Sequence, residues 1–278
     1  MALDLSAVGK ELPASTYEYN DRDVMLYALG VGATTDDLSF VYEKELKVLP
    51  TFAVIPAFPA LMSIGSLLEF NPAMLLHGEQ RIELRGPIPT SGKLTTQAKI
   101  TAIYDKGSGA VVVIDAETKD ESGGVLFANT FGVFLRGEGG FGGERGPSAS
   151  KKNVPPERAP DHTIEDKIPL NQAAIYRLSG DRNPLHIDPE FAKMAAFDRP
   201  ILHGLCTFGY AGRAVLNAVC GGDPARLKDF EVRFAGVAYP GETIITEIWQ
   251  EGPDKAIVRA TTAERGEPVI SNAAATIS

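Results

Sequence analysis

The spacing of hydrophobic and polar residues divides the chain into two halves that contain similar elements. β-rich runs with the composition and bounding turns typical of strands close each half. They cover residues 111–117 and 125–135 in the first half, and 243–249, 256–262 and 269–276 in the second. The run 93–103 follows Gly92, and the run 242–250 follows Gly241. Both halves are therefore expected to end in an antiparallel meander of strands.

Helical patterns precede the strands in both halves. A short amphipathic helix is expected over 21–29, after the cap residue Asn20, and another over 171–178. A longer apolar helix is expected over 205–219, ended by Gly221 and Gly222, and its counterpart over 59–69. A helix followed by antiparallel strands is typical of an α+β fold and not of a doubly wound parallel sheet.

A shift of 149 residues aligns parts of the two halves, which predicts a duplicated fold. Tyr27-Ala-Leu29 then falls on Tyr176-Arg-Leu178, and Gly92 falls on Gly241. Residues 136–162 are dense in glycine, proline and charge, as expected of a linker. We therefore predict repeats over 1–135 and 163–278.

Composition excludes several classes of protein. The 278 residues carry 27 basic and 36 acidic side chains, a net charge of −9, which argues against binding to nucleic acid or to an anionic membrane surface. No run of 18 apolar residues is present, so no membrane span is expected. Cys206 and Cys220 lack metal-binding spacing, which argues against a zinc site or a disulfide scaffold and favours a reducing compartment.

The densest polar cluster is residues 176–188, where Asp181 and His186 lie five positions apart. Gly180 and Pro184 place both on a turn, from which both side chains can reach one pocket. A carboxylate beside an imidazole can hold and activate a water as a general acid/base pair. A helix cap beside a surface histidine would give the same pattern, because Asp-x-Asn-Pro also forms turns.

A second cluster leads into the long apolar helix at Gly204. The N–H groups of the first helical turn lack partners, and the helix dipole is positive there. The Gly204 N–H could therefore polarise a carbonyl as an oxyanion hole does. The alternative is that Gly204 only relieves crowding where the helix passes a sheet.

Residues 176–189, YRLSGDRNPLHIDP, closely resemble the hydratase 2 motif of the MaoC-like (R)-specific enoyl-CoA hydratases. The resemblance continues through 195–209, AAFDRPILHGLCTFG, and includes LHGEQ at 76–80, DKGSG at 105–109 and GGFGG at 139–143. It therefore spans nearly the whole chain, including the first half and the linker. The resemblance implies a double hot dog, in which each half wraps an antiparallel sheet around a long helix.

The resemblance also implies roles for individual residues. Asp181 and His186 match the catalytic dyad, Asn183 supports it, and the Gly204 N–H faces the thioester oxygen. Glu43 matches a family acid that we interpret as structural. Contacts with the acyl-CoA are implied for four residues: His77, Gly78, Lys106 and Phe234. Lys106 could equally be the solvated tip of a hairpin instead of a partner for a CoA phosphate.

The first half lacks the dyad. At the 149-residue shift, Asp181 corresponds to Gly32 and His186 to Asp37. The resemblance implies that this degenerate repeat accommodates the acyl chain.

The activity implied by the resemblance is reversible hydration of a trans-2-enoyl-CoA to a (3R)-3-hydroxyacyl-CoA. No metal or other cofactor is expected, since CoA is part of the substrate. A homodimer is expected. A cytoplasmic location is expected too, or a peroxisomal one in a eukaryote, although the C-terminus is not a Ser-Lys-Leu-type signal. The alternatives are a hot-dog acyl-CoA thioesterase and a non-catalytic acyl-CoA-binding protein.

Overall fold

The computed structural model describes residues 3–148 and 152–278, which form one ten-stranded antiparallel sheet. The strands of the first half are β1 (Ser15–Tyr19), β2 (Leu75–Leu84), β3 (Gly92–Asp105), β4 (Gly109–Lys119) and β5 (Val125–Arg136). Those of the second half are β6 (His162–Lys167), β7 (Leu227–Phe234), β8 (Thr243–Gln250), β9 (Lys255–Thr262) and β10 (Pro268–Ile277). All five runs expected as strands at the ends of the halves lie within β4, β5, β8, β9 and β10, as predicted.

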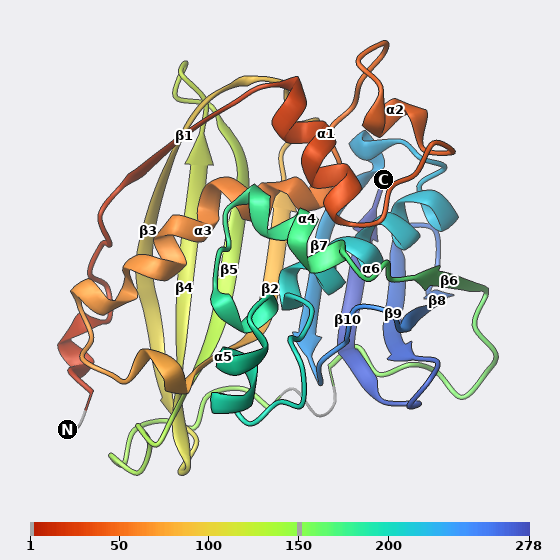
Figure 1. The fold of residues 1–278 in the computed structure, drawn as a ribbon. Helices are drawn as coiled ribbons and strands as arrows, with labels where there is room; N and C mark the ends of the chain where they lie inside the picture. The colour runs from red at the N-terminus through yellow and green to blue at the C-terminus, as the bar shows by residue number, and fades with distance from the viewer. Residues whose placement is uncertain (1–2, 149–151) are drawn as a thin grey trace.

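The order of the strands is symmetric about the middle of the sheet (Figure 1). It reads β1-β3-β4-β5-β2-β7-β10-β9-β8-β6, so each strand of the first half has its counterpart at the same distance from the centre in the second half. The pairing of β2 with β7 joins the two halves edge to edge. The α+β class is thereby confirmed, and the sheet has the repeat that the sequence predicted.

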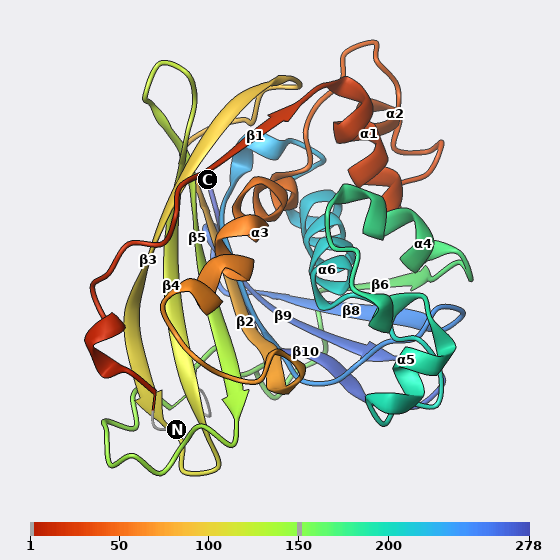
Figure 2. The ribbon, with the colours of Figure 1, turned by 60° about the vertical axis from the view of Figure 1, so that its left-hand side comes forward.

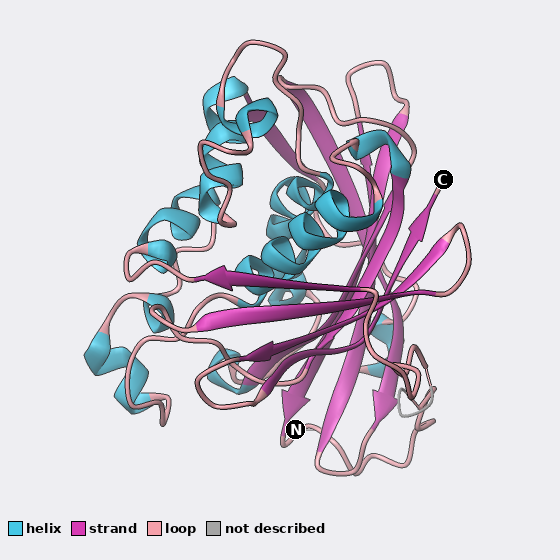
Figure 3. Ribbon diagram, turned by 90° about the vertical axis from the view of Figure 1, so that its right-hand side faces the viewer, coloured by secondary structure: helices cyan, strands magenta, loops and turns pink. Residues whose placement is uncertain are grey.

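The helices lie on one face of the sheet (Figures 2 and 3). They are α1 (Asp21–Gly30), α2 (Leu38–Val41), α3 (Val54–Met62), α4 (Gln172–Tyr176), α5 (Pro189–Met194) and α6 (Gly204–Val219). The sheet curves around α3 and α6. Phe208 of α6 stacks on Phe230 of β7, with ring centroids 4.9 Å apart, and both rings are fully buried. The main core includes residues of both halves. None of the described helices is long and apolar enough to cross a membrane.

The predicted bounds hold for two helices and fail for two. α1 begins at the expected Asn20 cap, which forms a capping box with Asp23, and α6 differs from its predicted range by one residue. The helix expected over 59–69 exists, but its predicted bounds are wrong. α3 begins at Val54, contains Pro59 in its interior, and tightens into the 3-10 turn Ser63–Ser66. The apolar run before Pro59 is buried, which outweighs the preference of proline for a helix start.

The α-helix expected over 171–178 ends two residues earlier than predicted. α4 ends at Tyr176, and Arg177–Ser179 continue as a 3-10 turn before Gly180, whose φ is 143°. The tighter winding ends the helix early. The chain then turns into the segment that carries Asp181.

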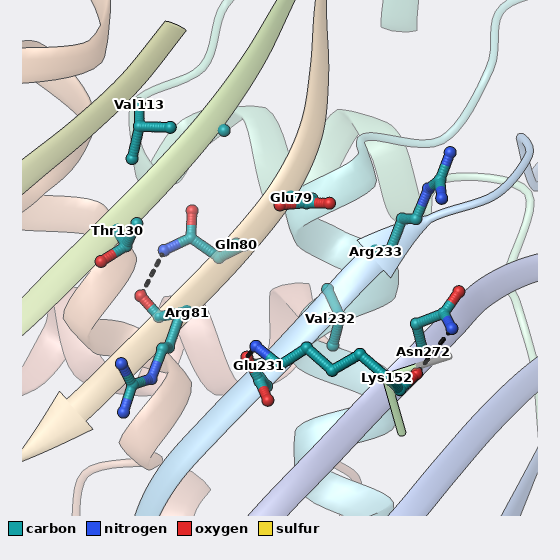
Figure 4. Close-up of a pocket in the computed structure, with 11 residues that line it drawn as sticks. Glu79, Gln80, Arg81, Val113, Thr130, Lys152, Glu231, Val232, Arg233 and Asn272 are labelled. Carbon is teal, nitrogen blue, oxygen red and sulfur yellow. Dashed lines mark hydrogen bonds and ion pairs between the residues drawn. The ribbon is translucent and has the colours of Figure 1, made fainter. Parts of the chain in front are cut away.

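The segment between β5 and β6 has no helix or strand in residues 137–148 and 152–161. Its glycine-rich beginning is held on the β3–β4 turn by Asp105, whose carboxylate accepts N–H groups from Gly107, Gly140 and Gly142. Farther along, Lys152 and Asn153 both contact the Glu231 carboxylate on the face of the sheet opposite the helices. These contacts partly enclose a hollow of about 200 Å³ over the β2–β7 seam, lined largely by charged and polar side chains (Figure 4).

Candidate active site

The loop after α4 presents Asp181 and His186 through two small turns. The Asp181 carboxylate accepts the N–H of Asn183 at 3.1 Å, and the Asn183 side chain accepts the N–H of Leu185 at 3.0 Å. Pro184 then begins a 3-10 turn that ends at His186. Asn183 caps this turn, as expected from the turn-forming pattern Asp-x-Asn-Pro. The same turns bring Asp181 and His186 together.

The Asp181 carboxylate and the His186 ring face each other across a short gap. Oδ2 of Asp181 lies 3.9 Å from Nε2 of His186. Nδ1 of His186 lies 2.9 Å from the carbonyl oxygen of Ile201. Because a carbonyl oxygen only accepts, Nδ1 must carry the hydrogen, and neutral His186 keeps its lone pair on Nε2. The gap thus lies between two hydrogen-bond acceptors. A water donating two bonds of about 2.8 Å would span about 4.4 Å, close to this gap.

His186 is buried, with 8% of its surface exposed. Burial lowers the pKa of His186, while the Asp181 carboxylate and the bond to Ile201 act in the opposite direction. A lowered pKa keeps the imidazole neutral near pH 7. It can then accept a proton at Nε2.

His203 is a site residue that the sequence reasoning missed. Its ring stacks on His186 with centroids 3.7 Å apart, and its Nε2 donates to the backbone carbonyl of Asp181 at 3.1 Å. The Tyr176 ring lies 4.9 Å from the His203 ring. Burial, and next the charge of His186, lower the pKa of His203 to about 2. The available signal was its position directly before Gly204.

Gly204 is the first residue of α6 and is exposed. Among the described residues, none accepts a hydrogen bond from its N–H. Since His203 contacts both dyad residues, the start of α6 lies beside the dyad. A Cβ added at Gly204 would lie 3.4 Å from Cε1 of Phe234. An unpaired N–H at a helix N-terminus next to an acid/base pair is suited to bind a carbonyl oxygen.

Phe234 and His77 form a wall next to Gly204. The two rings pack edge to face with centroids 5.0 Å apart. Gly78 lies where β2 shifts register against β5, between the pairs made by His77 and Glu79. A Cβ at Gly78 would approach the Gly132 carbonyl oxygen to 3.3 Å, so a side chain would crowd this bulge. Burial lowers the pKa of His77 to about 4.

Comparison with known proteins identifies the family. Residues 17–137 match the family model described as MFE-2 hydratase 2 N-terminal domain, and residues 151–273 match the MaoC like domain. The chain is 43% identical to a probable enoyl-CoA hydratase 2 of Dictyostelium discoideum, over 100% of this chain and 97% of that protein. The chain belongs to the MaoC-like hydratase 2 family.

Other members of the MaoC-like hydratase 2 family are longer. Peroxisomal multifunctional enzyme type 2 of Mus musculus is 47% identical over 97% of this chain, which spans 38% of that protein. Among solved structures, a MaoC-like dehydratase from Phytophthora capsici matches with a TM-score of 0.88 and 37% identity, covering 98% of this chain and 97% of that one. A Mycobacterium tuberculosis protein described as having a double hotdog fold matches with a TM-score of 0.61 at 13% identity, covering 97% of this chain and 95% of that one. The predicted family and the double hot-dog fold are confirmed.

Two residues named from the hydratase 2 resemblance, Lys106 and Glu43, have surroundings that differ from those expected. Lys106 is on the β3–β4 turn, and these two strands lie three and two strand spacings from β2, or roughly 10–14 Å. Its ammonium donates to the carbonyls of Arg145 and Pro147, so it is neither a freely solvated tip nor part of the dyad cluster. Glu43 is exposed, which gives no support to a structural role.

The cluster of Asp181, His186 and His203 offers three potential metal ligands within 4.8 Å of one another. The arrangement fits a metal poorly. The two imidazoles are stacked with only 27° between their planes, and a lone pair lies in the plane of its ring. Near-parallel rings 3.7 Å apart cannot direct their lone pairs to one ion about 2.0–2.1 Å from each nitrogen. The geometry suits an acid/base pair better.

Proposed function

We propose that this chain catalyses the reversible hydration of trans-2-enoyl-CoA to (3R)-3-hydroxyacyl-CoA, with Asp181 and His186 as the dyad. The observation that carries the proposal is the 3.9 Å gap between the Asp181 carboxylate and the unprotonated Nε2 of His186. Relatives named enoyl-CoA hydratase and 3-hydroxyacyl-thioester dehydratase support the same reaction class.

In the proposed reaction, the two acceptors hold one water by its hydrogens and direct its oxygen at C3 of the enoyl group. One of the pair takes a proton as the C3–O bond forms, and the electrons of the double bond move toward the thioester. The dyad returns the proton to C2, so the elements of one water are added from one face. General acid–base catalysis of this kind contributes about 10²–10⁴ in rate.

The thioester oxygen gains negative charge during this step, and the Gly204 N–H is placed to stabilise it. We assign Phe234, His77 and Gly78 to the wall against which the reacting end of the acyl-CoA lies. Asn183 supports the dyad indirectly, by capping the turn that presents His186. Thioester polarisation already acidifies C2, so we propose that no metal or other cofactor takes part.

The first half is proposed to accommodate the acyl chain and not to catalyse. Gly32 has a φ of 84°, and a Cβ there would come within 2.2 Å of the Tyr210 ring, so an aspartate could not replace it without rearrangement. Titration with a slowly reacting substrate analogue should give about one site per chain. Two equal sites would contradict the degenerate role of residues 1–135.

For the CoA moiety, we propose that a phosphate lies near Lys106, where it would compete with the linker carbonyls for the ammonium group.

We further propose that the chain forms a homodimer. Light scattering would then give twice the chain mass of 29.7 kDa. A cytoplasmic location is proposed as well, in keeping with the two free buried cysteines. Fractionation of the source cells tests it.

The decisive experiment incubates the purified protein with trans-2-enoyl-CoAs of increasing chain length. Hydration removes the absorbance of the conjugated thioester reversibly, and chiral analysis should show the 3R product. Release of a free thiol would instead indicate a thioesterase, and neither change would indicate a binding protein. The chain-length series also measures what the first half accommodates.

A further inference from the structure

His203 lies between two aromatic groups of the site, and the hydration mechanism leaves it without a role. Only 1% of its surface is exposed. One face packs on His186 and the ring of Tyr176 lies near it as well. It is the residue before Gly204, so it joins the dyad loop to the start of α6.

The hydrogen bonds of His203 fix its tautomer. Its Nε2 faces the Asp181 carbonyl, an acceptor, and must therefore carry the hydrogen. Its Nδ1 is buried and has no hydrogen-bond partner among the described residues. An unpaired buried nitrogen costs free energy that an apolar ring of the same shape would avoid. The bond to Asp181 is thus what an imidazole provides here and a phenyl ring would not.

We propose that His203 is a positioning residue that acts on both members of the dyad, an inference that rests on the proposed function. Its Nε2–H holds the peptide of Asp181 and so sets the direction of the carboxylate. Its ring covers one face of His186, which excludes water from that face and keeps the imidazole neutral. The titratable groups that face the two imidazoles are Asp181 from the loop, Arg177 from the preceding 3-10 turn and Tyr176 from α4. The first effect maintains the gap that one water fills, and the second keeps Nε2 of His186 free to accept a proton.

Two variants separate the two effects. His203→Phe keeps a ring against His186 but removes the donor to Asp181. We expect a fall in kcat of roughly tenfold to a hundredfold, the scale of a small misplacement of a catalytic group, with little change in KM. His203→Gln keeps an N–H donor near the Asp181 carbonyl but uncovers His186. Its kcat should remain near the wild-type value on the pH plateau.

The acid limb of the pH profile should move in His203→Gln and stay in place in His203→Phe, the reverse of the pattern expected for kcat. Exposure of His186 to water relieves the desolvation that lowers its pKa, so His203→Gln should move the acid limb to higher pH. His203→Phe should leave the limb in place. His162→Phe, on edge strand β6, is the matched control and should leave kcat, KM and the profile unchanged. Turnover is expressed per folded molecule, so that a purely structural loss does not imitate a positioning effect.

Titration of the His186 ring by NMR supplies a test that needs no turnover. It should show the same rise in pKa in His203→Gln and none in His203→Phe. If the wild-type protein failed to hydrate any enoyl-CoA, the proposed function would fall while this titration still tested the effect of His203 on His186. If both variants kept kcat per folded molecule within twofold and the His186 titration did not move, the positioning role would be wrong.

Discussion

The two halves of the chain differ at the start of their central helices, α3 and α6. α6 begins at Gly204, exposed and directly after a buried histidine that contacts the dyad. At the 149-residue shift, Gly204 corresponds to Ile55 of α3, which is only 5% exposed. The 3-10 turn Pro50–Ala53 leads directly into α3 and is buried. The first half therefore has a helix start covered by apolar side chains, where the second half has an open one.

The loops before these helices differ in the same sense. Asp37 corresponds to His186 at the 149-residue shift. Its carboxylate forms an ion pair with Arg213 of α6 at 3.4 Å and accepts a hydrogen bond from the Asn217 side chain. Arg213 also pairs with Asp166 of β6. A shared sheet thus supports a polar, partly open site on one side. On the other side it supports a buried ionic contact that ties the first half to the second. Duplication preserved the strand order, whereas the lengths of the elements differ: α3 has 9 residues and α6 has 16, and β3 has 14 residues where β8 has 8.

The largest expected effect comes from breaking the dyad. Asp181→Asn or His186→Ala should reduce turnover at least a hundredfold, because the first replaces the basic carboxylate with a neutral amide and the second removes the imidazole acceptor. Both groups lie on a loop, so the circular dichroism spectrum should be retained. Steady-state assays on a short enoyl-CoA measure the loss. Near-normal turnover in either variant would show that the difference between the halves lies elsewhere.

Substitution of Gly204 tests the open helix start. Gly204→Val should lower turnover by about 10²–10³, the scale for losing one oxyanion donor, since a branched side chain would displace the thioester. Gly204→Ala is a milder companion, because its Cβ would lie at ordinary contact distance, 3.4 Å, from Phe234. Thermal midpoint and turnover per folded molecule are measured on the same samples. A large loss of stability with unchanged specific turnover would support the crowding alternative instead.

The sequence predicted features that follow from local pattern and failed where packing decides. Five strand segments, α1 with its Asn20 cap, and the start of α6 next to Gly204 could all be located. The bounds of α3 could not, because burial of the run before Pro59 outweighs the local preference of proline. His203 could not be found from spacing, since its contacts with Asp181 and His186 span 22 and 17 residues and depend on the turn at Gly180. Lys106 was matched by motif, but its linker contacts appear only in the folded chain.

Replacing Asp37 tests the structural role of the corresponding loop in the first half. Asp37→Asn removes one of the two carboxylates around Arg213, which keeps Asp166 as a partner. We expect a loss of about 1–3 kcal/mol in the free energy of unfolding, the cost of weakening a buried charged hydrogen bond. Denaturant titration measures the loss. Turnover per folded molecule should not change, and a large fall in turnover at unchanged stability would mean that the first half takes part in catalysis.

The free energy of unfolding is also expected to depend on pH, because His186 and His203 are buried and His77 is half-buried. The pKa is lowered in the folded chain for His77, His186 and His203, to about 4 and about 2 for the first and last, whereas unfolded histidine titrates near 6.5. Below that pH the unfolded chain binds more protons than the folded one, so the free energy of unfolding falls as the pH drops from about 6.5 toward 4. Each histidine adds at most about 1.4 kcal/mol per pH unit, and His77, which is only half-buried, should add the least. Carboxylates with lowered pKa values, such as Glu264, lose their stabilisation at lower pH, so the slope between pH 6.5 and 5 belongs to the histidines. Denaturant titrations across this range should therefore give a flatter slope for His203→Gln than for His77→Gln, and equal slopes would show that the two halves bury their histidines to the same effect.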